Sequence, residues 1–320
     1  PTMLAGWPVV PLARTSSLLR VPITLPRAVQ RSGAELLHVQ YNAPPVSPCP
    51  FVVSVHDVGW VKHPQFFTPG MRSRLALLTP NTLRRARRVF ALTQAIAEEI
   101  SEVYGTPLDR IDVVSPAVDP VFSPNHADSE IEAARHRYHL PEQFVLYTGA
   151  LQPRKNLTRL ATAFSRLVKK GLPHTLVIAG RRAWLHKGML EDIERLNLGD
   201  RIHFTGYVEQ DDLPCIYAAA SAFVYVSIYE GFGLPVLEAL ATGTPVLASS
   251  IAAIKEVAGD AAAYCEPLDV EDMERSLEKL LGDNALQSKL RVEGPKRAAK
   301  FTRKAMANAA IEGYRRALES

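Results

Sequence analysis

The sequence has few cysteines and no long apolar run, and each shortage excludes a class of protein. Its 320 residues include only three cysteines, Cys49, Cys215 and Cys265, and none of them forms a C-x-x-C pair. A scattered set of this kind argues against a disulfide framework and against a structural zinc site. No stretch reaches the ~18–20 consecutive apolar residues of a transmembrane helix, and no basic-then-apolar signal peptide opens the chain. We therefore expect reduced thiols and a cytoplasmic location.

An excess of charge of one sign is also missing. Lys and Arg number 37 against 33 Asp and Glu, which leaves a net charge of +4. This mild basic bias fits an anionic substrate or an anionic membrane surface, and it does not by itself indicate nucleic acid. No basic patch is interleaved with aromatic residues, so we expect no nucleic-acid partner. The nine histidines show no H-E-x-x-H or similar spacing, so we expect no tightly bound metal.

Short apolar runs of strand length alternate with helical patterns from residue 36 onward. The Pro-rich residues before them predict a loop with a short helix near Leu25–Arg31. In the first half, the predicted strands are Leu36–Val39, Phe51–Val55, Val89–Leu92 and Ile111–Val114, and the predicted helices are Met71–Arg85 and Gln94–Tyr104. This alternation predicts a parallel sheet.

The pattern lapses over Ser115–Glu130, where prolines and loop-forming residues predict a linker between domains. It restarts with predicted strands Phe144–Tyr147, Thr175–Ala179, Ile202–Thr205, Ala222–Val226, Pro245–Ala248 and Ala261–Tyr264, and with predicted helices Leu157–Lys170, Met189–Asn197, Leu213–Ala220, Pro235–Thr242 and Val270–Leu281. The tail, Asn284–Ser320, reads as helix broken near Gly294-Pro295. We predict an α/β fold of two Rossmann-like doubly wound domains that face a cleft, residues 1–124 and 125–300, with helix 301–320 completing the first.

The segment YEGFGLPVLE follows a predicted strand and has the composition of a phosphate cradle. Gly231 and Gly233 permit a tight turn and a close approach of ligand to backbone. Pro235 suits the first position of a helix, whose N-terminus offers N–H groups to a phosphate. Glu230 and Glu238 flank this cradle, and carboxylates accept hydrogen bonds from sugar hydroxyls. The segment fits a nucleotide sugar, although glycine-rich junctions of this kind also occur in α/β proteins without sugar chemistry.

A second segment, YTGALQPRKN, again combines a strand, a glycine turn at Gly149 and a helix start. Arg154 and Lys155 stand side by side just before the helix. Positioned cations stabilise the charge that develops on a diphosphate leaving group, most strongly in the transition state. The alternative interpretation is a solvated basic helix start.

The spacing of Glu230 and Glu238 within EGFGLPVLEALATGTPV resembles the signature of glycosyltransferase family 4, whose members have the GT-B fold. The segments FTGYVEQDDLPCIYAAASAFVYVS and IKEVAGDAAAYCEPLD fit the same pattern, and PRKN resembles the phosphate-clamp loop of mannosyltransferase-like members. The resemblance implies that Glu230 contacts the donor sugar and that Glu238 contacts the ribose. The other donor-binding residues that it implies are Gly149, Arg154, Lys155, Tyr207, Val208, Gly231, Phe232, Gly233 and Leu234.

On the acceptor side, His56 and Asp57 end a predicted strand and resemble the HD turn of the family. The resemblance gives His56 a catalytic part beside Glu230, Arg154 and Lys155, whereas His56 by itself is also typical of a structural histidine. Family members usually begin with a strand, a glycine-rich loop and a helix before anything like Ala34. This chain lacks that unit, so we expect a shortened N-terminal domain.

The resemblance implies a retaining glycosyltransferase that moves a hexosyl group from a nucleoside-diphosphate sugar to a hydroxyl of a glycan or lipid-linked acceptor. GDP-mannose is the favoured donor, and neither a metal nor another tightly bound cofactor is implied. The basic run RRARR at residues 84–88 is typical of a solvated helix end, and the alternative is peripheral contact with the inner membrane face. Two other functions remain open: a non-catalytic or weakly active sugar-nucleotide-binding protein, and an epimerase or phosphorylase on the same fold.

Overall fold

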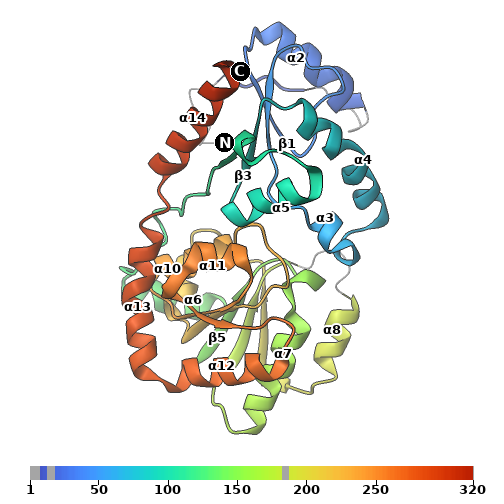
Figure 1. Ribbon diagram of the computed structural model, residues 1–320. Coiled ribbons are helices and arrows are strands. Elements are labelled where there is room, and N and C mark those ends of the chain that lie inside the picture. The colour runs from blue at the N-terminus through green and yellow to red at the C-terminus, as the bar shows by residue number, and fades with distance from the viewer. Residues whose placement is uncertain (1–7, 13–18, 182–186, 320) are drawn as a thin grey trace. The chain divides into compact units, whose positions relative to one another are not determined.

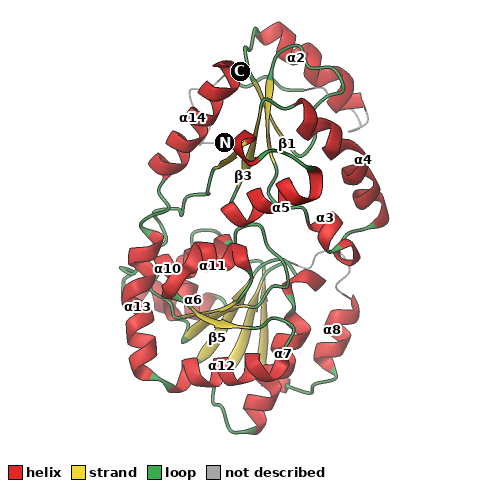
Figure 2. Ribbon diagram, in the orientation of Figure 1, coloured by secondary structure: helices red, strands yellow, loops and turns green. Residues whose placement is uncertain are grey.

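The computed structural model describes residues 8–12, 19–181 and 187–319, which form two compact units (Figure 1). The first unit comprises the described chain up to Leu92, residues 96–114 and the stretch from Ala307, and the second comprises residues 93–95 and 115–306. Each unit holds one parallel sheet with helices packed on it (Figure 2). The predicted fold class, two Rossmann-like α/β domains, is confirmed. None of the described helices combines the length and the apolar character that crossing a membrane requires.

The first unit is built on four parallel strands in the order β1-β2-β3-β4. The strands are β1 (Leu37–Gln40), β2 (Phe51–Ser54), β3 (Arg88–Ala91) and β4 (Ile111–Val113). The helices are η2 (Arg20–Thr24), α2 (Leu25–Ser32), α3 (Gly59–Lys62), η3 (Pro64–Phe66), α4 (Pro69–Arg85), α5 (Gln94–Tyr104), η4 (Leu108–Arg110) and α14 (Arg303–Glu319). Val52, Val53 and Val89 are fully buried. Successive residues of β2 are therefore covered on both faces of the sheet, as parallel sheets require.

Helix α14, red in Figure 1, belongs to the end of the chain but packs on β3 and β4 of the first unit. Gly313 permits the close approach, since a Cβ at this position would lie 2.4 Å from the Phe90 ring. Next to this contact, the buried Asp112 carboxylate accepts hydrogen bonds from Arg88, with Nη2 to Oδ1 at 2.7 Å, and from Arg316. Two cations thus compensate one buried carboxylate, which fixes where the helix docks.

The second unit has six parallel strands in the order β10-β9-β8-β5-β6-β7. The strands are β5 (Phe144–Thr148), β6 (Thr175–Ala179), β7 (Ile202–Gly206), β8 (Ala222–Tyr225), β9 (Val246–Ser249) and β10 (Ala263–Cys265). The helices are α6 (Asp128–Arg137), η5 (Pro153–Lys155), α7 (Leu157–Lys169), α8 (Lys187–Glu194), η6 (Gly199–Arg201), α9 (Leu213–Ala219), α10 (Leu234–Ala241), α11 (Ala252–Ala258), η7 (Gly259–Ala261), α12 (Val270–Gly282) and α13 (Asn284–Ala298).

Chain order reverses at the middle of this sheet, where β5 lies between β6 and β8. From β5 the chain builds outward through β6 and β7, and from β8 it builds the other way through β9 and β10. In open α/β sheets, ligands bind at the carboxyl ends of the strands at such a reversal. The loops that follow β5 and β8 are therefore where the fold itself favours a binding site.

The predicted linker extends too far, because α6 already begins at Asp128. This helix was not predicted, and its sequence shows why: Ala134 is its only buried residue, which leaves almost no apolar periodicity. The start signal is polar instead. The Glu130 carboxylate accepts the Ala127 backbone N–H at 3.1 Å, and acidic residues occupy the first turn.

The predicted break near Gly294-Pro295 is wrong. Helix α13 runs through both residues and ends at Ala298. A proline inside a helix removes one hydrogen-bond donor, but packing compensates for this loss here. A Cβ on Gly294 would lie 2.8 Å from the carbonyl oxygen of Leu240, so α10 and α13 meet almost backbone to backbone.

Replacing Gly313 by Ala should lower the free energy of unfolding by about 1–3 kcal/mol, because the added methyl group overlaps the Phe90 ring. Denaturant unfolding followed by circular dichroism measures this change. Gly282→Ala is the matched control, since nothing lies within 4 Å of a Cβ at that position near the end of α12. Equal stability of the two variants would contradict the close docking of α14.

Candidate functional site

Two loops at the reversal of strand order carry most of the predicted donor-side residues. The loop after β5 contains Gly149 and continues through η5, with Arg154 and Lys155, into α7. The loop after β8 contains Glu230 and leads into α10. A backbone hydrogen bond from Ile228 N to Arg154 O, at 2.9 Å, joins the two loops. Lys155 and Glu230, which are 75 positions apart in the sequence, are also hydrogen-bonded to one another across the two loops.

The first loop depends on two glycines and one asparagine. Gly149 has a φ of +138°, a value that favours glycine, and a Cβ on Gly180 would lie 1.9 Å from the Gly149 carbonyl oxygen. Asn156 adopts a left-handed φ of +64°, and its side-chain amide donates to the carbonyls of Val226, at 3.0 Å, and Pro267. The asparagine thus connects the start of α7 to the ends of β8 and β10.

Glu230 lies between the two predicted phosphate-binding cations. Its Oε1 is 2.6 Å from Lys155 Nζ, and its Oε2 is 2.7 Å from Arg154 Nη1. Arg154 also donates to the Tyr229 carbonyl at 3.1 Å, and the Tyr225 hydroxyl donates to Glu230 Oε1 at 3.0 Å. The structure therefore brings Glu230, Arg154 and Lys155 together as one ion cluster with a surplus positive charge, which suits an anionic ligand.

The ionisation of Glu230 is fixed by this cluster. Burial by itself would raise the pKa of the Glu230 carboxyl, but the charges and hydrogen bonds of Lys155 and Arg154 outweigh it and lower the pKa to about 2. Lys155 is itself only 7% exposed and lies 4.7 Å from the centroid of the Tyr225 ring. Glu230 is thus a permanent anion at neutral pH and a weak base.

Glu238, in α10, has the opposite electrostatic environment. Burial raises the pKa of the Glu238 carboxyl to about 7, and the hydrogen bond from the Tyr217 hydroxyl, at 3.0 Å, only partly opposes this. Tyr217 is 2.7 Å from Thr148 Oγ1 at the end of β5, so a chain of hydroxyls runs from the strand to the carboxyl group. Among the residues that the structure describes, no cation forms an ion pair with Glu238, whereas Glu230 has two.

The segment Gly231–Leu234 turns the chain from the Glu230 loop into α10. Gly233 is the N-cap in the left-handed region, with a φ of +90°, and Pro235 occupies the first turn, where a missing N–H costs nothing. Phe232 is buried, whereas Leu234 is exposed. The predicted strand, glycine turn and helix start are all present at the carboxyl end of β8.

Tyr207 and Val208 follow β7. The Tyr207 ring is 50% exposed, while Val208 is buried. The guanidinium carbon of Arg181, at the end of β6, lies 3.9 Å from the centroid of the Tyr207 ring. Arg181 was not predicted as a site residue, because an arginine beyond a strand end carries no sequence signal that separates it from any other surface cation.

The remaining predicted residues, His56 and Asp57, belong to the first unit. They follow β2, and Asp57 Oδ1 accepts the Gly59 N–H at 3.0 Å, which starts α3. The His56 ring packs against Tyr41 with a centroid distance of 5.4 Å. Burial lowers the pKa of His56, although Asp57 opposes this. His56 is therefore mainly neutral at pH 7 and able to accept a hydrogen bond.

The hydroxyl groups near the strand ends were not predicted from the sequence. Tyr147 is the last residue but one of β5 and Tyr225 is the last residue of β8, and Tyr225 contacts Glu230 directly. Among the described residues, the buried hydroxyls of Tyr147, Ser227 and Ser249 have no hydrogen-bond partner. Buried polar atoms without partners are rare. The signal in the sequence that could have predicted them is a polar residue at the carboxyl end of an apolar run.

Solved structures of similar fold define the class. Anabaena Alr3699/HepE in complex with UDP-glucose matches with a TM-score of 0.78 and 19% identity, covering 98% of this chain and 87% of that one. Sucrose-phosphate synthase from Thermosynechococcus elongatus matches with a TM-score of 0.76 and 22% identity, covering 96% and 80%. At such low identities the likeness shows the fold, which is the GT-B fold of glycosyltransferases.

The sequence identifies the family within that class. Residues 128–297 match the model of Glycosyl transferases group 1, and residues 3–122 match that of Glycosyltransferase Family 4. The first match alone covers more than half of the chain, so the protein belongs to the group 1 glycosyltransferases. The predicted family and enzyme class are confirmed.

Curated relatives include bacterial mannosyltransferases. The serotype-specific mannosyltransferase WbdA of Escherichia coli is 35% identical over 243 residues, which is 74% of this chain but only 29% of WbdA. The O-antigen chain mannosyltransferase B of Escherichia coli is 29% identical over 266 residues, covering 82% of this chain and 70% of the relative. The chain thus spans less than a third of the WbdA protein that it matches.

Breaking the ion cluster of Glu230, Arg154 and Lys155 should destabilise the folded protein. Glu230→Gln should lower the free energy of unfolding by about 3 kcal/mol, because it leaves the buried Lys155 ammonium without its closest carboxylate. In a double-mutant cycle, adding Lys155→Met should recover part of this loss, with a coupling of about 1–3 kcal/mol. Denaturant unfolding of the four proteins measures the coupling, and additive effects would argue against a mutually compensating pair.

Glu238 should make stability depend on pH. Its pKa is raised from 4.5 to about 7, so between these values the folded state binds more protons than the unfolded state. Stability then falls as the pH rises through this window, by up to about 1.4 kcal/mol per pH unit for one proton. Glu238→Gln removes the titration, so its stability relative to the unchanged protein should rise from pH 5 to pH 8. A constant difference over this range would refute the raised pKa.

Proposed function

We propose that the protein transfers mannose from GDP-mannose to a hydroxyl of a glycan or lipid-linked acceptor, with retention of the anomeric configuration. The observation that carries the proposal is the cluster of Glu230, Arg154 and Lys155 at the reversal of strand order. It combines surplus positive charge for a diphosphate with a fixed carboxylate for sugar hydroxyls. The second unit is then the donor-binding domain, and the first unit is the acceptor-side domain.

Each donor-side residue has a part in this proposal. Arg154 and Lys155 bind the diphosphate, Glu230 binds the sugar, and Glu238 binds the ribose. The backbone N–H groups of the glycine turns then meet the phosphate and the sugar, and the base lies beside Tyr207 and Val208. The residues that supply these N–H groups are Gly149, Gly231, Phe232, Gly233 and Leu234.

In the proposed glycosyl transfer, the protein forms no covalent bond with the sugar. As the bond between the anomeric carbon and the phosphate oxygen breaks, the electron pair goes to the phosphate, and the two cations stabilise the growing charge. A carboxylate whose pKa is held at about 2 is a poor base, so Glu230 is not the group that removes the acceptor proton. In the proposed mechanism the leaving phosphate takes this proton while the acceptor oxygen bonds to the same face of the sugar.

The choice of mannose rests on the relatives. WbdA and O-antigen chain mannosyltransferase B are both named as mannosyltransferases, and the latter name specifies an O-antigen chain. The complex of HepE with UDP-glucose keeps uridine donors as the principal competitors.

On the acceptor side, a neutral His56 accepts a hydrogen bond from the acceptor hydroxyl, and Asp57 holds the loop. The basic end of α4 favours peripheral membrane contact.

A thermal-shift panel with GDP-mannose, UDP-glucose, UDP-N-acetylglucosamine and ADP-glucose tests the donor. Binding to the native state stabilises it by mass action, by about 2.7 kcal/mol at one hundred times the Kd. We expect GDP-mannose to raise Tm by a few degrees and Glu238→Ala to abolish the shift. NMR of the transfer product then reports its anomeric configuration, which should match that of the donor.

Glu271→Ala is the control, because this carboxylate is exposed on α12 and should leave the shift intact. A shift with a uridine or adenosine donor alone would replace the proposed donor. A shift without transfer or donor hydrolysis would favour a sugar-nucleotide-binding protein. No shift with any donor would overturn the proposal.

A further inference from the structure

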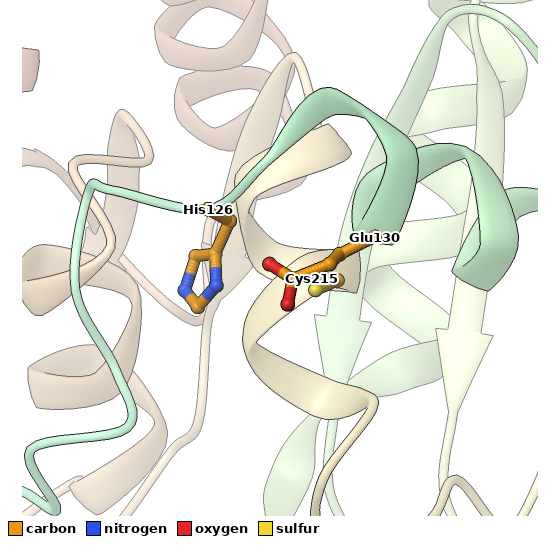
Figure 3. Close-up of side chains that lie close together, drawn as sticks. All are labelled: His126, Glu130 and Cys215. Atoms are coloured by element: carbon orange, nitrogen blue, oxygen red, sulfur yellow. The ribbon is translucent and has the colours of Figure 1, made fainter.

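Three side chains of different chemistry converge on the second unit, away from the loops described above. His126 lies in the segment before α6, Glu130 is in the first turn of α6, and Cys215 is in the first turn of α9 (Figure 3). Their ligand-type atoms, a ring nitrogen, a carboxylate oxygen and the Sγ, all lie within 4.8 Å of one another. Helices α6 and α9 pack together, so the cluster is a product of the fold of this unit.

The donor atoms of this cluster are available. The Nε2 of His126 is buried and has no hydrogen-bond partner among the described residues. Glu130 uses Oε2 to accept the Ala127 N–H at 3.1 Å, which fixes the orientation of the carboxylate. Cys215 is a free thiol and is only 7% exposed. A buried, unpartnered imidazole nitrogen beside a thiol and a held carboxylate requires an explanation, because such nitrogens normally find a partner.

The charges around the cluster favour a cation. Two carboxylates, those of Glu130 and Asp212, lie close enough to Cys215 to act on it electrostatically. Asp212 is already bound by Arg137, with Nη1 to Oδ2 at 2.6 Å, and by the Tyr138 hydroxyl at 2.7 Å. Asp212 therefore affects the cluster through its electrostatic field and does not serve as a metal ligand. A metal ion bound at the cluster would take the Cys215 sulfur as a thiolate, so the site would gain a second negative ligand beside Glu130.

We propose that His126, Glu130 and Cys215 form a binding site for a divalent transition metal of the zinc type. Imidazole nitrogen, thiolate and carboxylate are the ligands that Zn²⁺ takes, whereas Mg²⁺ and Ca²⁺ prefer sets of oxygen ligands. Bonds of about 2.0–2.3 Å to one ion place neighbouring ligands about 3.5 Å apart, so the three side chains close in by about 1 Å on binding. A water molecule takes the fourth tetrahedral position.

Binding involves one proton. The S–H bond of Cys215 breaks, the sulfur gives its electron pair to the metal, and the proton passes to solvent. The bound ion then connects the segment before α6 with α9, the helix that also carries Tyr217 and its hydrogen bond to Glu238. This proposal departs from the expectation of no metal, which rested on closely spaced motifs. Here one ligand is 85 or more positions away from the other two, so no local motif exists.

Cobalt titration of the chelator-treated full chain tests the site. Co²⁺ bound by a thiolate gives sulfur-to-metal charge-transfer absorption, and a tetrahedral site gives intense visible bands. We expect both signals to saturate at one equivalent and to disappear when Zn²⁺ displaces the cobalt. Competition with a chromophoric chelator then gives the Zn²⁺ affinity, which should fall at least 10-fold in His126→Ala and Glu130→Gln. Cys215→Ser should abolish the charge-transfer band.

Matched controls separate the site from incidental binding. His136→Ala and Glu132→Gln change exposed residues of the same helix, and Cys49→Ser removes a partly buried thiol outside the cluster. These three variants should bind like the unchanged protein. The His126 and Glu130 variants keep the test valid even if Cys215→Ser fails to fold, since both alter residues outside the apolar core. No thiolate–cobalt band in the unchanged protein, or full binding in His126→Ala, would overturn the proposal.

Discussion

The second unit depends on the compensation of one buried carboxylate by two cations. Glu230 comes from the loop after β8, whereas Arg154 and Lys155 come from the loop after β5, so their ion pairs join the two strands at which chain order reverses. None of the three charges can be buried alone at acceptable cost. The loops therefore adopt their conformation together, and the glycines and Asn156 supply the unusual backbone angles that this requires.

Glu230 and Glu238 show how environment assigns different properties to one residue type. Both belong to the same loop–helix segment, yet the pKa of the first is about 2 and that of the second is about 7. The first is surrounded by cations, and the second by a hydroxyl and buried surface. One carboxylate is thus a fixed anion at neutral pH, while the other changes its protonation close to neutral pH. This difference separates a charge that organises the loops from a carboxyl group whose charge is set by the pH.

Features encoded in short windows of sequence were predictable. The strands, the glycine turn before α10 and the adjacent Arg154 and Lys155 each lie within a few residues, where periodicity and turn chemistry act. The polar connections were not predictable, because they join distant positions. Thr148 meets Tyr217 across 69 residues, and His38 meets Tyr314 across 276. Helix α6 escaped prediction for another reason, since its polar start and single buried residue leave little periodic signal.

The docking of α14 also constrains the order in which the protein is built. The ribosome releases β3 and β4 long before it releases Gly313 and Arg316, which cover Phe90 and pair with Asp112. During synthesis the chain of the second unit is therefore already made while Phe90 still lacks the cover of α14. A nascent chain in this state exposes the apolar surface around Phe90, and its Asp112 carboxylate has Arg88 but not Arg316 as a partner, so aggregation competes with folding until α14 docks.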